Sequence, residues 1–278
     1  MLNVLAFSCP LLLAATGALF SEYTGSLALF LDGFITLSGF LTFAFTAATC
    51  SVVLGIILSC VTITAAGLLF AFIVEKTKAN KFIAAIAMNL LAGALTSLFS
   101  SLIFKTRGVL VSPSFSFAPK NVSIFAIIIT AVLVAAAIVY LKKTQSGIYF
   151  RITGTNAQEL KVRGVSPELY RILSWGIASL FAGLAGSIMA MKVSSFVPNL
   201  ASGKGWLALA VVFMGRKSLW KIAVCILIFC GIDFAAVYIQ SIFPAIPSSI
   251  VLALPYIMVL LLIGIRDIFF DFFKIKFD

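Results

Sequence analysis

Two polar side chains stand out because long apolar stretches surround them. Asp233 lies in CGIDFAAVYIQ and Asn89 lies in AIAMNLLAGAL. A carboxylate or an amide in apolar surroundings is costly unless it faces water or a hydrogen-bonding partner. Each side chain therefore either lines a hydrated path or holds one helix against another, and the sequence leaves both interpretations open. Gln240, Ser241 and Ser187 are weaker candidates, since they lie nearer the ends of such stretches.

The residue types that enzymes need are scarce. The chain has no histidine, which removes the usual imidazole base, proton relay and metal ligand. The few carboxylates form no paired cluster, so we predict no catalytic residue, no metal site and no cofactor bound by this chain. The cysteines lie in apolar runs without the spacing of metal ligands, where cysteine behaves as a small hydrophobe: Cys9, Cys50, Cys60, Cys225 and Cys230.

A phosphate-binding loop is also missing from the sequence. Such loops read Gly-x-x-x-x-Gly-Lys-Ser/Thr, because backbone N–H groups cradle the phosphates and the lysine reaches them. The Gly203-Lys204 pair has Pro198 at the position of the first glycine and Gly205 after the lysine. We therefore expect no ATPase site in this chain.

The composition indicates which elements must position the polar residues. Hydrophobic residues make up 62% of the chain and charged residues only 10%, which places it among integral membrane proteins. A helix of about 20 residues crosses the hydrocarbon core of about 30 Å. Five apolar runs have that length, and four others could span, tilt or re-enter. The five are 53–74, 82–104, 122–141, 172–191 and 248–265, and the four are 3–20, 33–49, 206–214 and 222–240. We predict an all-α, polytopic membrane helical bundle of about eight or nine transmembrane or partly re-entrant helices. It forms a single domain over residues 1–278.

The basic residues predict the orientation of this bundle. Most of the twenty Lys and Arg residues fall in residues 75–81, 142–171 and 216–221 and in the C-terminal tail. Loops rich in Lys and Arg stay on the cytoplasmic side. The net charge of +11 then reflects topology and attraction to anionic lipid, and we expect no nucleic-acid partner. The opposite side receives Lys105, Arg107, Lys120, Lys192 and Lys204.

The polar stretch at residues 143–170 carries helix signals. Thr155 and Gln158 have the spacing of a capping box, and Gly164 suits a left-handed helix end, so we predict a short helix at 156–163. Ser166 followed by Pro167 predicts the start of the next helix. We expect a sharp turn at Gly154. These signals alone would also suit a solvated connector.

Several motifs together resemble one transporter family. Gly147, Arg151, Gly154, Asn156 and Ala157, with Gly164 about ten residues after Gly154, resemble the cytoplasmic coupling loop of ABC importer permeases. The branch is the one with branched-chain amino acid, ribose and nucleoside permeases. FVPNLASGKGWLALAVVFMGRKSLW (196–220), LFSEYTGSLALFLDGF (19–34) and PYIMVLLLIG from Pro255 agree with it, and the pattern at 203–215 is most similar to the nucleoside members.

The sequence also departs from the family pattern. Ala28, Phe30 and Asp32 stand where the family usually carries Asn, Gly and Glu. Ile152 and Thr153 stand where it often has a second arginine. The hydrogen bonds at the first motif must therefore differ, and we add Asp32 to Asp233 and Asn89 as a candidate for the translocation path.

The resemblance implies a permease subunit that forms the path for a small polar solute through the bacterial plasma (inner) membrane. Nucleosides are the first expectation, with riboflavin, a sugar or an amino acid as alternatives. Expected partners are a second homologous permease, a solute-binding (lipo)protein, membrane lipid and a separate ATPase subunit that holds ATP and Mg²⁺. The ATPase-coupling loop would use Gly147, Arg151, Gly154, Asn156, Ala157, Leu160 and Gly164.

Two other classes stay open from the residues alone. A secondary transporter or channel would work without ATP, although the scarcity of intramembrane carboxylates and histidines disfavours proton coupling. A membrane scaffold would need neither the punctuated loop nor Asp233.

Small residues predict close helix contacts in GIASLFAGLAGSIMA. Gly176, Gly183 and Gly186 recur there at helical spacing and let two backbones approach. They either pack within the chain or face a second permease copy. GSLALFLDGF and GKGWLALAVVFMG also look related, which suggests an internal repeat.

Overall fold

The structure, a computed structural model, describes residues 2–242 and Ile257. Within residues 2–242 it is helical, and the β-type pairing is one isolated bridge between Leu110 and Phe196. The helices are α1 (Leu2–Tyr23), α2 (Leu31–Thr49), α3 (Val52–Thr77), α4 (Lys81–Phe104), η1 (Pro113–Phe115), α5 (Pro119–Lys143), α6 (Gln145–Thr155), α7 (Ala157–Val162), α8 (Pro167–Val193), α9 (Lys204–Met214) and α10 (Leu219–Ile242).

Six of the described helices are long and apolar enough to cross a membrane, namely α1 to α5 and α8. The predicted all-α polytopic fold is therefore confirmed. The runs at 3–20 and 33–49, which the sequence left open, belong to spanning helices. The 11 residues of α9 rise only about 16 Å, about half of the hydrocarbon core. The predicted run at 248–265 lies outside the described residues except for Ile257.

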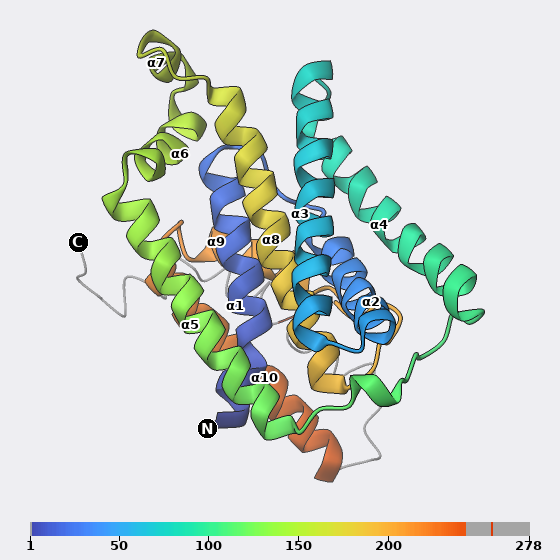
Figure 1. The fold of residues 1–278 in the computed structure, drawn as a ribbon. Helices are drawn as coiled ribbons and strands as arrows, with labels where there is room; N and C mark the ends of the chain where they lie inside the picture. Colours follow the sequence, from blue (N-terminus) through green and yellow to red (C-terminus); the bar gives the residue numbers. More distant parts are fainter. Residues whose placement is uncertain (1, 243–256, 258–278) are drawn as a thin grey trace.

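The helix α8 is the centre of the bundle and packs against α1, α2 and α3 (Figure 1). Two thirds of its most apolar window is buried, compared with 22% for α4 and for α5, which lie on opposite flanks. The flanking helices expose Leu, Ile, Val and Phe side chains where lipid would contact them. Three buried hydroxyls join α2, α3 and α8: Thr42 Oγ1 lies 2.8 Å from Ser59 Oγ and 2.7 Å from Ser187 Oγ. Ser187 therefore holds helices together in the core.

Two links inside the bundle are not helical. Residues 24–30 separate α1 from α2, and residues 194–203 separate α8 from α9. The first residues of α2 and α9 then meet, because the Asp32 carboxylate accepts a hydrogen bond from the Gly205 N–H. The two links therefore bring two helix N-termini together within the protein.

The loops at 75–81, 142–171 and 216–221, which were predicted to share one side, lie toward one end of the bundle (Figure 1). The C-terminal tail, predicted for the same side, lies outside the described residues. Glu75, at the end of α3, is ion-paired with Lys81 and lies 3.9 Å from Arg171 at the start of α8. The turn between α9 and α10 is held to the end of α1, since Tyr23 Oη donates to the Lys217 carbonyl at 2.6 Å. The helices α6 and α7 project from this end.

The stretch at 143–170 contains more helix than the sequence predicted. Helix α6 was missed: it begins after Thr144, whose side chain accepts from the Gly147 N–H at 3.0 Å. The predicted capping box is wrong. Asn156 caps α7 by accepting from the Glu159 N–H, whereas the Thr155 hydroxyl donates back to the Arg151 carbonyl at 3.3 Å. The Thr155 hydroxyl thus bonds within α6 and does not cap α7.

Candidate functional site

A cavity of about 360 Å³ lies between α2, α4 and the link before α9. Its lining combines apolar side chains with several polar ones that could contact a ligand. They come from both helices, from the loop after α4 and from the link, and include Asp32, Thr36, Asn89, Ser97, Arg107 and Asn199. The cavity therefore offers hydrogen-bond donors and acceptors inside a largely apolar bundle.

Asn89 has a defined structural role in this cavity. Its Oδ1 accepts a hydrogen bond of 2.6 Å from the N–H of Gly33, the third residue of α2. The N–H groups of a first helical turn have no partner within the helix, so they need one from elsewhere. With Oδ1 facing Gly33, the Nδ2 group is the part of this side chain left to donate to a ligand.

Asp32 likewise accepts a hydrogen bond from the first turn of α9. Its Oδ1 accepts from the Gly205 N–H at 3.0 Å, which satisfies one donor of the first turn of α9. Gly205 must be glycine for this approach, because a Cβ there would lie 2.6 Å from the Asp32 Cα. The Thr36 hydroxyl also accepts from the Ala201 N–H at 3.3 Å. The start of α2 thus fixes the link before α9.

The structure brings two of the three predicted path residues together. Asp32 and Asn89 line the same cavity, and each also makes the helix-to-helix contact that was the alternative interpretation. Asp233 lies on α10 and is not among the residues that line this cavity. Sequence reasoning missed Arg107 and Asn199, which come from links outside the apolar runs. Only their polarity beside a span could have signalled them.

The seven residues predicted for the coupling loop lie on α6, α7 and the turn that follows. Gly147 is buried at the start of α6, and the Arg151 guanidinium lies 5.4 Å from the centre of the Tyr23 ring. The predicted sharp turn at Gly154 is wrong, since this residue lies in the last turn of α6. Glycine is needed there for another reason. A Cβ would lie 3.0 Å from the Tyr23 carbonyl carbon.

The helix α7 has one face toward the chain and one toward solvent. Ala157 is half-buried and Leu160 is fully buried, so Leu160 anchors α7 to its own chain. The exposed apolar side chain is Val162, with 88% of its surface accessible. After α7, Gly164 has the predicted left-handed conformation, with φ of +76°. A partner protein would therefore meet Val162 rather than Leu160.

The three small residues of α8 face other helices of the same chain. The position of a Cβ on Gly176 would overlap Leu68 of α3, and one on Gly183 would lie 3.4 Å from Cys60 of α3. On Gly186 it would meet the backbone of Ile35 in α2. These glycines lie where α8 comes close to α2 and α3.

Comparison with known sequences identifies the family. The sequence pattern of the family described as "Branched-chain amino acid transport system / permease component" matches residues 1–264. The chain belongs to this permease family. The permease is 26% identical to the guanosine ABC transporter permease protein NupQ of Bacillus subtilis, over 92% of the chain and 88% of that protein. It is 23% identical to the nucleoside ABC transporter permease protein NupC of Lactococcus lactis, over 95% and 90%.

A third relative is named for a different substrate. The permease is 27% identical to the ribose import permease protein RbsC of Escherichia coli, over 56% of the chain and 50% of that protein. No solved structure matches the permease. The suspected family is thus confirmed, with nucleoside permeases among the relatives, and the chain is a multi-pass membrane permease whose relatives are transport components.

Proposed function

We propose that this permease is the membrane subunit of an ATP-binding cassette importer that carries nucleosides across the bacterial plasma membrane. The cavity between α2 and α4 supports this most directly. Amides and hydroxyls line it, with one carboxylate and one guanidinium, Asp32 and Arg107. Such a lining suits an uncharged solute with many hydroxyl and amide groups, because no charge of the solute needs a counter-ion there.

Nucleosides are favoured over a free sugar by the relatives. Two relatives that the permease matches over about nine tenths of its length are named for nucleosides or guanosine, whereas the ribose permease aligns with just over half of it. A sugar, riboflavin or an amino acid is the alternative within the same family. The whole chain would act as a single transmembrane domain.

A separate ATPase subunit would supply the energy, with ATP and Mg²⁺ bound there. We propose that it docks on α6 and α7, at the basic end of the bundle, which would be cytoplasmic. The fully buried Leu160 holds α7 on the chain and the exposed Val162 offers an apolar contact. The helix that follows α7 is α8, so a force on α7 would reach the centre of the bundle. A second permease and an external solute-binding protein would complete the importer.

Reconstitution tests this proposal. The permease would be purified with the proteins encoded beside it and inserted in liposomes with Mg²⁺ and ATP on the cytoplasmic face. We expect uptake of guanosine or uridine that requires ATP, with little uptake of ribose, riboflavin or leucine. Uptake that persists without ATP and follows an ion gradient would instead favour a secondary transporter.

A matched pair of variants tests the docking surface. Val162→Asp places a charge on the exposed apolar position of α7, and we expect loss of the ATPase subunit from the purified complex by about tenfold, which corresponds to about 1.4 kcal/mol. Val111→Asp is the control, since Val111 is 76% exposed in the loop after α4, at the other end. Equal retention of the ATPase in both variants would argue against docking at α7.

A further inference from the structure

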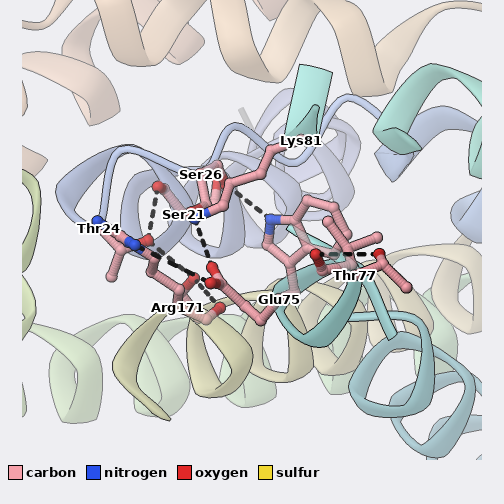
Figure 2. Close-up of polar contacts among 10 residues, drawn as sticks. Ser21, Thr24, Ser26, Glu75, Thr77, Lys81 and Arg171 are labelled. Atoms are coloured by element: carbon pink, nitrogen blue, oxygen red, sulfur yellow. Dashed lines mark hydrogen bonds and ion pairs between the residues drawn. The ribbon is translucent and has the colours of Figure 1, made fainter. Parts of the chain in front are cut away.

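A polar cluster gathers where α3, α4 and α8 meet the first non-helical link (Figure 2). Its centre is Glu75, with a side chain that is only 12% exposed. This carboxylate is ion-paired with Lys81 at the start of α4 and lies 3.9 Å from the Arg171 guanidinium of α8. Loss of the cationic partners would leave this largely buried carboxylate without a counter-charge, so the pairing fixes how the three helices meet.

The same part of α8 holds residues 24–30. The indole N–H of Trp175 donates to the Ser26 carbonyl at 2.8 Å, and Trp175 is 2% exposed. The Thr24 hydroxyl donates to Ser174 Oγ at 2.8 Å. The Trp175 ring packs edge-on against Phe30, with 5.2 Å between the ring centres. Two hydrogen bonds and one aromatic contact therefore attach this link to α8.

The link is stabilised by α1 and by α8. Residues 24–30 form no helix, so their backbone groups need other partners, and the N–H groups of Gly25 and Ser26 donate to carbonyls in the last turn of α1. The Ala28 N–H donates to Ser21 Oγ, and the Ser26 carbonyl receives the indole N–H. Without Trp175 the Ser26 carbonyl would be buried with its hydrogen bond lost.

The cluster joins the two functional regions along a short path. Arg171 and Trp175 lie in the first turns of α8, which starts soon after α7 ends. The far end of the link is Phe30, two residues before Asp32 in the cavity. A displacement of α8 by the coupling loop would therefore reach the cavity through contacts that are all present in the structure.

We propose that Trp175 is a positioning residue for transport. Its hydrogen bond to the Ser26 carbonyl makes residues 24–30 move with α8 as one body. Motion of the coupling loop then moves Asp32. This inference rests on the proposed function. It identifies which contact transmits the motion, which the family resemblance does not supply.

The variant Trp175→Phe keeps an aromatic ring and removes the indole N–H. The control is Trp220→Phe, since Trp220 lies on α10 with 71% of its surface exposed. The reconstituted complex would be assayed for guanosine uptake and for ATP hydrolysis in the same vesicles. We expect Trp175→Phe to hydrolyse ATP within about twofold of wild type but to import at least about fivefold less guanosine per ATP, and Trp220→Phe to keep the wild-type ratio.

This ratio separates positioning from simple packing. If Trp175 only fills space, uptake and ATP hydrolysis fall together through loss of folded complex, and the ratio stays at its wild-type value. That result would overturn the inference while ATP-driven uptake by the wild type leaves the proposed function intact. Absence of ATP-driven uptake in the wild type would refute the proposed function and this inference with it.

A cross-link tests whether the link and α8 move together. Thr24→Cys and Ser174→Cys, in a background without the native cysteines, place two thiols where hydroxyls are 2.8 Å apart. We expect the oxidised complex to retain at least half of the uptake of the same reduced complex, since a disulfide would only reinforce an attachment that persists. Loss of uptake on oxidation, restored by reduction, would show that the link must leave α8 and would overturn the inference.

Discussion

Gly154 and Gly164 are both glycines of the coupling loop, but the structure requires glycine at each for a different reason. At Gly154 the conformation is helical, and the limit is space. A Cβ would lie 3.0 Å from the carbonyl carbon of Tyr23 and 3.1 Å from the N of Gly25, and closer still to the Tyr23 carbonyl oxygen. These are backbone atoms, which cannot rotate away as a side chain can. Gly154→Ala should therefore cost about 1–3 kcal/mol, as overpacked sites do.

At Gly164 there is space and the limit is the backbone. No heavy atom lies within 4 Å of a Cβ there, whereas φ is +76°. An L-residue in the left-handed region costs about 1–2 kcal/mol, and loss of glycine freedom in the unfolded chain returns about 0.4–1 kcal/mol. Gly164→Ala should thus cost between about 0 and 1.6 kcal/mol. Gly164→Asn should cost less, since asparagine tolerates this region, and Gly164→Val should cost more.

Limited proteolysis of the purified permease measures both changes, because the loop opens locally before it is cut. A cost of about 2 kcal/mol raises the open fraction, and hence the cleavage rate within the loop, by about thirtyfold. Gly108→Ala is the control, since Gly108 lies in an exposed loop at the other end and a Cβ there meets only the Thr106 hydroxyl, at 3.5 Å. Cleavage of Gly154→Ala at the rate of the control would refute the packing argument. A Gly164→Asn variant cleaved as fast as Gly164→Val would refute the backbone argument.

Three further predictions concern topology and the intramembrane polar residues. Single cysteines at Gln158 and Ser114, in a background without native cysteines, should be labelled from the cytoplasm and from outside respectively, and labelling from one side would contradict the assignment of α5. If Asp233 lines a hydrated path, Asp233→Asn should alter uptake more than assembly. If Asp233 only holds helices together, Asp233→Asn should be tolerated and Asp233→Leu should lower the yield of complex. Wild-type uptake and yield in both variants would remove Asp233 from the candidates. Asn89→Leu should cost about 1–3 kcal/mol by leaving the Gly33 N–H unpaired, seen as a lower melting temperature, and an unchanged melting temperature would contradict the role assigned to its Oδ1.

The sequence predicted α3, α4, α5 and α8 as spans because each contains an apolar run near the length of a membrane crossing, and this signal is independent of tertiary contacts. The runs of α1 and α2 are shorter or contain polar residues, so the sequence left them open. It did not predict α6, which contains Gly147 and Gly154, two residues that disfavour a helix. Tertiary packing stabilises α6 instead. The Phe150 ring is fully buried and contacts Phe20 and Tyr170 edge-on, at 5.6 Å and 5.1 Å.

The sequence predicted individual polar residues of the cavity but not which residues they contact. Asn89 was identified because it is polar within an apolar run, and Asp32 because it departs from the family pattern at the first motif. Their contacts join residues 56 and 173 positions apart, and no periodicity encodes such pairings. Capping was misassigned by one residue for a local reason, because Thr155 and Asn156 both have side chains that cap and the Thr155 hydroxyl bonds within α6 instead.

The hydrogen bond from Trp175 to Ser26 also has a consequence for biogenesis. Its two residues lie 149 positions apart in the chain. At a synthesis rate of about 5–20 residues per second, the ribosome adds α8 roughly 7–30 s after residues 24–30 emerge. During that interval the Ser26 carbonyl can find its partner only in water, in the lipid headgroups or on an insertion factor. The nascent chain should therefore keep this link at the membrane surface until α8 arrives. Ribosome-bound chains truncated before Trp175 should expose a cysteine at position 26 to aqueous reagents, and longer chains should protect it.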